Sequence, residues 1–271
     1  MVDLGVGKNM TRSIRFWMQA SGIASSVAKG AGYKLTEFGN KLLGKGGHDR
    51  FLEDDRTLWL IHWKLATNQV NPLLAWDYLL NHWHEPEIVQ SVVVKALHKE
   101  AARHEDDLSR VTIEQHFETF LHTYVPTRGR KGEVLEDNLD CPLVELELIT
   151  RVGERPTEKG RGDPIYVFRR EEKPEIAPEL FAYCLNDFWN NRRSNESTLS
   201  FREVAHGHGS PGQIFKLPED DIRARLEQLT RHANSGFSYS ESASLQQVRR
   251  REIRDEIEML RQIYRPGGIH V

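Results

Sequence analysis

Apolar residues recur at intervals of three and four along most of the chain, which is the spacing of one face of a helix. Residues 8–20 place Met10, Ile14, Trp17 and Met18 close to this spacing, with basic residues between them. The pattern predicts a short amphipathic helix that begins directly after a tight glycine turn.

Two neighbouring segments form the most apolar part of the chain. Residues 55–68 and 72–83 are both rich in leucine and aromatic side chains, and together they contain four of the six tryptophans. We interpret them as two buried helices of an aromatic core, with Asp55 as the expected N-cap of the first. Packing alone explains such an aromatic stripe, so no cofactor site is inferred from it.

The remaining segments alternate between helical and strand-like patterns. Amphipathic stretches predict further helices over residues 86–104, 111–125, 177–192, 218–232 and 252–264. Shorter runs predict a strand leading into a short helix over residues 33–43, and hairpins over residues 148–170 and 236–250.

Helices followed by a small hairpin occur three times, although no sequence repeat accompanies them. The predicted fold is therefore mainly α with small β-hairpins, organised as tandem winged-helix-like modules around an aromatic helical core. The expected modules are a winged-helix-like unit over residues 1–50, a helical core with a second helix-turn-helix and wing over residues 51–175, and a C-terminal winged-helix-like unit over residues 176–271.

Composition narrows the function classes without selecting one. The 271-residue chain has 37 Lys and Arg against 40 Asp and Glu, a net charge of −3, so any DNA-binding surface must be local. No apolar run approaches the roughly 18 residues that a membrane span needs, and the polar N-terminus does not look like a signal peptide. Two cysteines are too few for a disulfide scaffold, so we expect a cytoplasmic protein with reduced thiols.

The first predicted helix carries the clearest basic surface. A nucleotide-binding loop is disfavoured there, because the phosphate-loop motif needs glycine where Val2 stands and a hydroxyl where Asn9 stands. Lys8, Arg12 and Arg15 give the helix a basic side instead, which suits the second helix of a helix-turn-helix. These three residues are predicted to contact DNA phosphates. The alternative is an ordinary helix with a solvated basic face.

A series of motifs extends in unbroken order over nearly the whole chain. They are "LGVGKNMTRSIRFW", "LTEFGNKLL", "FLEDDRTLWLIHWKLATN", "TYVP" followed by "EDNLDCPLVELELI", "FAYCLNDFW", "GSPGQIFKLPED" and "SASLQQVRRREI". With these motifs the chain resembles a bacterial family catalogued as a domain of unknown function. Members of that family resemble the SspB component of DNA phosphorothioation and anti-phage defence systems.

The resemblance implies a role but no site residues. It implies DNA binding in a phosphorothioation and phage-defence system, with single-strand cleavage by a nickase that works beside a cysteine desulfurase and a sulfur-inserting enzyme. The alternatives are a non-catalytic DNA-binding adaptor that recruits the sulfur-inserting partners, and a pure protein-interaction module. The implied partners are double-stranded DNA and other proteins of the system, with a homodimer left open. Family members carry further residues before "LGVGKN", so either the gene begins at a different position or the first module is truncated.

A nicking endonuclease needs groups that bind phosphate and a metal ion that activates water. Residues 128–140 combine a basic, glycine-spaced cluster with an acidic cluster directly after it, and Mg²⁺ and Mn²⁺ prefer such oxygen ligands. The alternative is a polar linker whose acids cap the next helix. The predicted residues are Lys131, Asp137 and Asp140 for catalysis, Glu136, Asp137 and Asp140 as metal ligands, and Arg128 and Arg130 for DNA binding.

Two other charged clusters have simpler interpretations. Lys159 and Arg161 lie near the tip of the hairpin predicted over residues 148–170, and we expect them to bind DNA phosphates without sequence preference. The acidic residues 53–55 directly precede an apolar helix, so helix capping explains them better than a metal site does.

Histidine and cysteine could add other chemistry. The pairs His82–His84 and His206–His208 could ligate a transition metal, but partners at fixed spacing are lacking, so surface or core histidines are favoured. Cys141 follows the acidic cluster, and nearby carboxylates would disfavour its thiolate. We interpret Cys141 as a small buried hydrophobe rather than a persulfide carrier.

Overall fold

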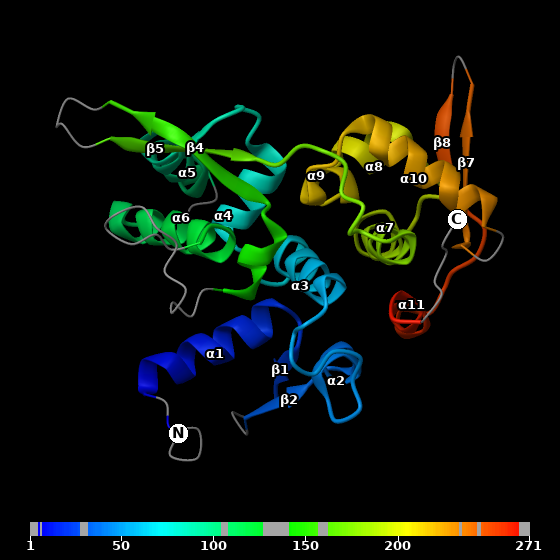
Figure 1. Cartoon of the computed structure of the whole chain (residues 1–271), viewed down its shortest axis with the longest axis horizontal. Coiled ribbons are helices and arrows are strands. Elements are labelled where there is room, and N and C mark those ends of the chain that lie inside the picture. The colour runs from blue at the N-terminus through cyan, green and yellow to red at the C-terminus, as the bar shows by residue number, and fades with distance from the viewer. Residues whose placement is uncertain are drawn as a thin grey trace.

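The computed structural model describes residues 5, 7–27, 32–103, 108–126, 141–156, 162–232, 235–242 and 245–265. Over these residues the chain is mainly helical with three small antiparallel sheets, which confirms the predicted fold class at this level. Figure 1 shows three groups of elements, with the N-terminal group below, the middle group at upper left and the C-terminal group at right. None of the described helices is long and apolar enough to cross a membrane.

The N-terminal group is one long helix, a hairpin and a short helix. It contains α1 (Lys8–Ala20), β1 (Ala24–Ser26), β2 (Tyr33–Leu35) and α2 (Glu37–Leu43). Thr36 joins the hairpin to α2, because its Oγ1 accepts from the N–H of Gly39 at 2.9 Å and donates to the carbonyl of Gly22 at 2.6 Å. Helix and hairpin approach so closely that a Cβ at Gly39 would overlap the carbonyl oxygen of Ile23.

The middle group begins with the two aromatic segments and ends in a hairpin. Its elements are α3 (Asp55–Thr67), α4 (Leu74–Asp77), the π-helical turn η2 (Tyr78–His82), β3 (Ile88–Val89), α5 (Gln90–Arg103), α6 (Arg110–Tyr124), the 3₁₀ turn η3 (Pro142–Leu146), β4 (Ile149–Arg155) and β5 (Asp163–Phe168). The strands pair in the order β3–β5–β4, so the last strand lies in the centre of the sheet. The hairpin predicted over residues 148–170 is confirmed.

The C-terminal group has a similar order of elements. They are α7 (Pro178–Arg192), β6 (Thr198–Ser200), α8 (Phe201–His206), α9 (Pro211–Phe215), α10 (Glu219–Arg231), β7 (Phe237–Glu241), β8 (Gln246–Arg250) and α11 (Glu256–Ile263). Its sheet has the order β6–β8–β7, so the last strand is again central. In both groups a short strand lies between the first helices and the later ones, and it pairs with the second strand of the later hairpin.

Helix α3 lies in the middle of the hydrophobic core. Trp59 and Trp63 are fully buried, and both rings pack against Phe215 of α9, at centroid distances of 5.5 and 5.4 Å. Trp76 of α4 packs edge-on against Phe120 of α6 at 5.0 Å. Apolar side chains from all three groups form one continuous cluster, as the predicted aromatic helical core requires.

Three local features differ from the expectation. Asp54 caps α3 in place of Asp55, because its carboxylate accepts from the N–H of Arg56. The helix predicted over residues 86–104 is preceded by β3, and α5 begins only at Gln90. The short strands β3 and β6 contain too few residues to show an alternating pattern, since such a pattern needs at least about four.

Candidate nucleic-acid interface

Helix α1 is attached to the body through its C-terminal half. Trp17 packs edge-on against Trp76 at a centroid distance of 5.8 Å, and Met18 is half-buried against the same core. Ser21, just after the helix, is buried, and its hydroxyl donates to the carbonyl of Trp17 at 2.7 Å. The N-terminal half extends along the edge of the molecule, at lower left in Figure 1.

The three basic residues predicted to contact DNA lie on this N-terminal half. Lys8, Arg12 and Arg15 are exposed, and among the described residues none of the three forms an ion pair. The guanidinium of Arg15 lies over the ring of Tyr33 at 5.6 Å, which links α1 to strand β2 of the hairpin. The three cations are therefore accessible to an anionic partner, and Arg15 also contacts the hairpin through Tyr33.

Two apolar side chains are exposed between these cations. Met10 is 56% exposed and Ile14 is 39% exposed, although the sequence pattern places both on one face with Trp17 and Met18. The predicted apolar face of α1 is therefore only partly buried, because the helix reaches the core through its last turns. The first half of α1 is a mixed basic and apolar surface.

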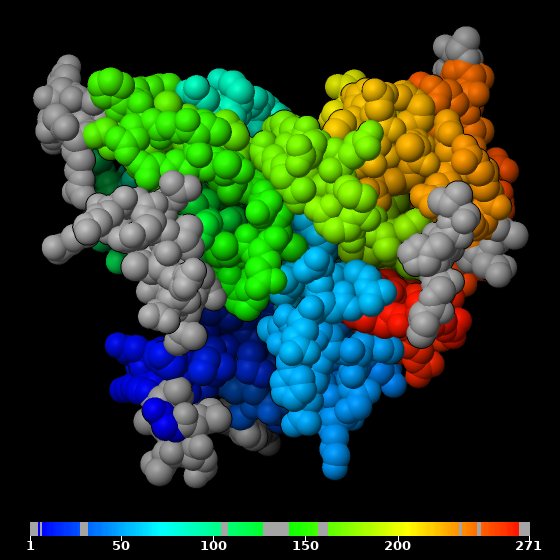
Figure 2. Space-filling view, viewed as in Figure 1, coloured from blue at the N-terminus to red at the C-terminus, as the bar shows by residue number. Residues whose placement is uncertain are grey.

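The positive charge of the chain is concentrated around α1. Residues 1–50 contain eight Lys and Arg against three Asp and Glu, whereas the whole chain has a net charge of −3. Lys34 on β2 and Lys45 after α2 are exposed as well. In Figure 2 this part of the chain (blue) forms the lower part of the molecule, beneath the middle group. A local basic surface on an acidic chain is suited to attract a polyanion.

The remaining predicted site residues lie outside the part of the chain that the structure describes. They are Arg128, Arg130, Lys131, Glu136, Asp137, Asp140, Lys159 and Arg161. The described base of the second hairpin is joined to the loop before β3 by an ion pair between Arg155 and Glu87 at 3.0 Å. The metal cluster and the hairpin tip therefore stay predictions.

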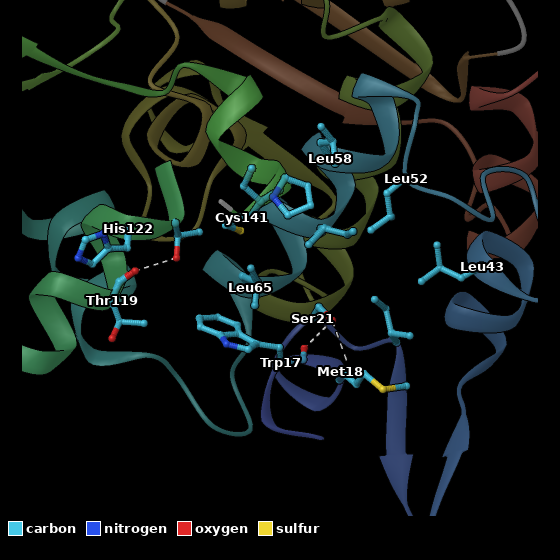
Figure 3. Close-up of a pocket in the computed structure, with 15 residues that line it drawn as sticks. Trp17, Met18, Ser21, Leu43, Leu52, Leu58, Leu65, Thr119, His122 and Cys141 are labelled. Carbon is cyan, nitrogen blue, oxygen red and sulfur yellow. Dashed lines mark hydrogen bonds between the residues drawn. The ribbon is translucent and has the colours of Figure 1, made fainter. Parts of the chain in front are cut away.

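An apolar pocket of about 700 Å³ lies between α1, α3, α6 and η3 (Figure 3). Its described lining, which includes Trp17, Leu65 and Cys141, contains no Asp, Glu, Lys or Arg. The hydroxyls of Ser21 and Thr123 donate to backbone carbonyls within their own helical segments. The described lining therefore offers no carboxylate for a metal ion, and its titratable side chains are His122 and Cys141. Cys141 is half-buried rather than buried as expected, and it packs against the core.

One histidine from each His-x-His pair comes close to the other in space. His82 of η2 and His208, between α8 and α9, lie beside Asp77, with one ligand atom of each within 4.8 Å of the others. His84 and His206 line a different pocket. In the sequence, the two His-x-His pairs were the feature that pointed to possible metal ligands here. Its third member, Asp77, stands in an apolar segment and carries no local signal.

Two solved structures share the fold of this chain. "Magnesium ion-bound SspB crystal structure" has a TM-score of 0.81 and 23% sequence identity, and the match covers 99% of this chain and 80% of that chain. "SspB crystal structure" has a TM-score of 0.79 and 22% identity, over 98% of this chain and 80% of that chain. No curated protein matches the sequence. Residues 1–264 match the family described as "Protein of unknown function (DUF4007)", and the chain therefore belongs to this family.

Proposed function

We propose that this chain is a cytoplasmic DNA-binding component of a DNA phosphorothioation and phage-defence system. The observation that carries the proposal is the exposed basic half of α1, whose Lys8, Arg12 and Arg15 have no ion-pair partner among the described residues. The fold that the chain shares with two SspB structures supports its assignment to such a system, and the sequence motifs point to the same family.

The order of elements suggests how α1 would meet DNA. The middle and C-terminal groups each run from a helix to a short strand, then through helices to a hairpin whose last strand lies in the centre of the sheet. We assign both groups to winged-helix-like modules, over residues 51–175 and 176–271. In the N-terminal group α1 directly precedes a hairpin, so α1 would lie along a groove and the β1–β2 hairpin would act as the wing.

DNA binding is tested directly by fluorescence anisotropy with a short labelled duplex. We expect binding at low salt that weakens steeply as salt is added, because phosphate contacts release counterions. Binding that ignores salt, or none at low ionic strength, would contradict the proposal. The third candidate, a pure protein-interaction module, is excluded by salt-sensitive binding.

We further propose that the chain nicks DNA with a divalent metal ion. In this proposal Glu136, Asp137 and Asp140 hold Mg²⁺ or Mn²⁺, and Lys131 lies near the scissile phosphate with Arg128 and Arg130. The support is the chemistry of residues 128–140 and the name of one fold neighbour, which describes a bound magnesium ion. The alternative is a non-catalytic adaptor that binds DNA and recruits sulfur-inserting partners.

Relaxation of supercoiled plasmid separates the nickase from the adaptor. The nickase should convert supercoiled plasmid to open circles with Mg²⁺ or Mn²⁺, and EDTA should stop the conversion. The adaptor should bind the same plasmid without relaxing it under any of these conditions. The double variant Asp137→Asn with Asp140→Asn, purified in the same way, serves as the control for a contaminating nuclease.

A further inference from the structure

Asp77, His82 and His208 meet where the middle and C-terminal groups adjoin. Asp77 ends α4, His82 ends the π-turn η2, and His208 lies between α8 and α9. Nε2 of His208 is 2.8 Å from Oδ1 of Asp77, and Nε2 of His82 is 4.0 Å from Oδ2. The two imidazole rings have centroids 5.1 Å apart. Three side chains of the types that bind transition metals therefore converge from two separate parts of the chain.

The π-turn is what brings Asp77 and His82 to one side. An α-helix turns residues five positions apart away from each other, whereas a π-turn bonds residue i to residue i+5. Here the N–H of Trp83 donates to the carbonyl of Tyr78 at 3.0 Å, which is such an i+5 bond. Single π-turns occur frequently at functional sites. This one places the side chains of Asp77 and His82 on the same side of the segment.

The side chain of Asn81 holds the two ligand-bearing segments together. Its Oδ1 accepts from the N–H of Gly209 at 2.7 Å, directly after His208. Its Nδ2 donates to the carbonyl of Asp77 at 3.1 Å and to Oδ1 of the same residue at 3.3 Å. Because Asn81 is buried, these bonds are shielded from water and constrain both segments. Such supporting contacts are typical of metal sites, where they orient the ligands.

Arg192 of α7 also binds His208. Its Nη1 lies 2.9 Å from Nδ1 of His208, and its guanidinium packs against Gly209. A guanidinium only donates, so Nδ1 accepts and the ring proton stands on Nε2, which faces Asp77. A metal ion on Nε2 would move that proton to Nδ1, where it would meet the Arg192 donor. Arg192 and a metal ion therefore compete for His208.

We propose that Asp77, His82 and His208 form a binding site for a divalent transition-metal ion, with Zn²⁺ preferred over Mn²⁺ and Mg²⁺. Two imidazole nitrogens and one carboxylate are a transition-metal ligand set, whereas Mg²⁺ favours oxygen ligands and keeps several waters. Three protein ligands leave a coordination position for water, and the three side chains are accessible to solvent. The site uses none of the residues proposed to hold the nickase metal, and it does not depend on the proposed DNA binding.

The first test is calorimetric titration of the metal-stripped full chain with Zn²⁺, Mn²⁺ and Mg²⁺. We expect one tight Zn²⁺ site per chain, with affinity at this site in the order Zn²⁺, Mn²⁺, Mg²⁺. His82→Ala and His208→Ala should each weaken Zn²⁺ binding more than about 100-fold, beyond the usual loss from a supporting residue. His84→Ala and His206→Ala are matched controls, because they remove imidazoles from the same two segments without touching the cluster. Equal loss in the controls, or no loss in His82→Ala, would overturn the site.

The second test addresses Arg192. Arg192→Gln removes the positive charge and replaces a donor-only guanidinium by an amide whose oxygen can accept from a proton on Nδ1, so Zn²⁺ should bind roughly tenfold more tightly, within the range that supporting residues exert. Arg193→Gln is the matched control, since it removes the neighbouring charge, which pairs with Glu203. Visible absorption of Co²⁺ bound in place of Zn²⁺ should report the nitrogen ligands and change in His82→Ala. Unchanged Zn²⁺ affinity in Arg192→Gln would overturn the competition.

Discussion

The hydroxyl of Tyr124 lies 2.7 Å from Nδ1 of His62, and both side chains are completely buried. The indole N–H of Trp76 donates to the same hydroxyl at 2.9 Å, and Nε2 of His62 lies 3.1 Å from the carbonyl of Ile214. A carbonyl only accepts, so Nε2 carries the proton and Nδ1 accepts from Tyr124. The neutral ring of His62 thus links α3, α4, α6 and α9 through one satisfied chain of hydrogen bonds.

We expect this arrangement to make stability depend on pH. Burial lowers the pKa of His62 to about 4, against the opposing effect of its bond to Ile214 and with help from the charges of Lys173 and Lys216. The unfolded ring binds a proton near pH 6.5, so folding loses stability as the pH falls from there toward 4, by up to about 1.4 kcal/mol per unit. Above pH 7.5 this contribution is complete and constant. Urea unfolding at pH 7.5, 6.5 and 5.5 measures it, and His62→Gln should flatten the dependence.

Removing the Tyr124 hydroxyl should destabilise the fold at every pH. In Tyr124→Phe both the Trp76 donor and the His62 acceptor lose their buried partner, which we expect to lower the free energy of unfolding by about 1–3 kcal/mol. Tyr33→Phe is the control, because that ring is exposed and its loss of a hydroxyl should change stability by less than about 0.5 kcal/mol. Equal urea midpoints for the two variants would show that the buried chain contributes nothing.

Gly39 should be irreplaceable at the contact between α2 and the first hairpin. A Cβ at this position would overlap the carbonyl oxygen of Ile23, so Gly39→Ala should cost about 1–3 kcal/mol of stability. Gly153→Ala is the control, since a Cβ there meets no atom within 4 Å. Thermal unfolding of the two variants checks this, and a Gly39→Ala protein as stable as Gly153→Ala would disprove the close approach.

The basic surface of α1 makes a quantitative prediction for DNA binding. Each phosphate contact that is removed should reduce the slope of log affinity against log salt by about 0.9, so Arg12→Ala with Arg15→Ala should reduce it by roughly two units. Arg261→Ala with Arg265→Ala removes the same charge from exposed positions at and just after the end of α11, outside the proposed helix-turn-helix and wing elements, and should leave the slope unchanged. Anisotropy titrations at several salt concentrations give the slopes. An unaltered slope in the α1 variant would remove α1 from the interface.

One double variant of the proposed nickase should lose DNA cleavage and keep DNA binding. Asp137→Asn with Asp140→Asn removes two carboxylates that would repel DNA and hold the metal, so DNA affinity should stay equal or rise. Magnesium-dependent plasmid nicking should disappear. Circular dichroism and the DNA titration establish that the variant is folded. Wild-type nicking by a folded double variant would mean that the metal is held elsewhere.

Local pattern determined much of the architecture. The apolar periodicity of residues 55–68 and the strand-like runs at 148–152 and 165–170 correctly predicted a buried helix and a hairpin, because the spacing of apolar side chains follows the local backbone geometry. The capping acids at residues 53–55 were also readable, since a cap acts within one turn. The concentration of positive charge in residues 1–50 can be counted from the sequence alone.

Only the tertiary structure determined the features that depend on contacts between distant segments. Met10 and Ile14 fit the apolar face of a helix, but only the placement of α1 against the core shows that they stay exposed. In the sequence, His62 is not distinguished from its neighbours in an apolar helix. The structure shows that α6 and α9 provide its hydrogen-bond partners. The sequence contains His82 and His208 in two similar pairs, yet their meeting beside Asp77 required a π-turn and the packing of two separate groups. Periodicity reports which side of an element is buried, whereas a site depends on which elements pack together and on how each side chain is turned.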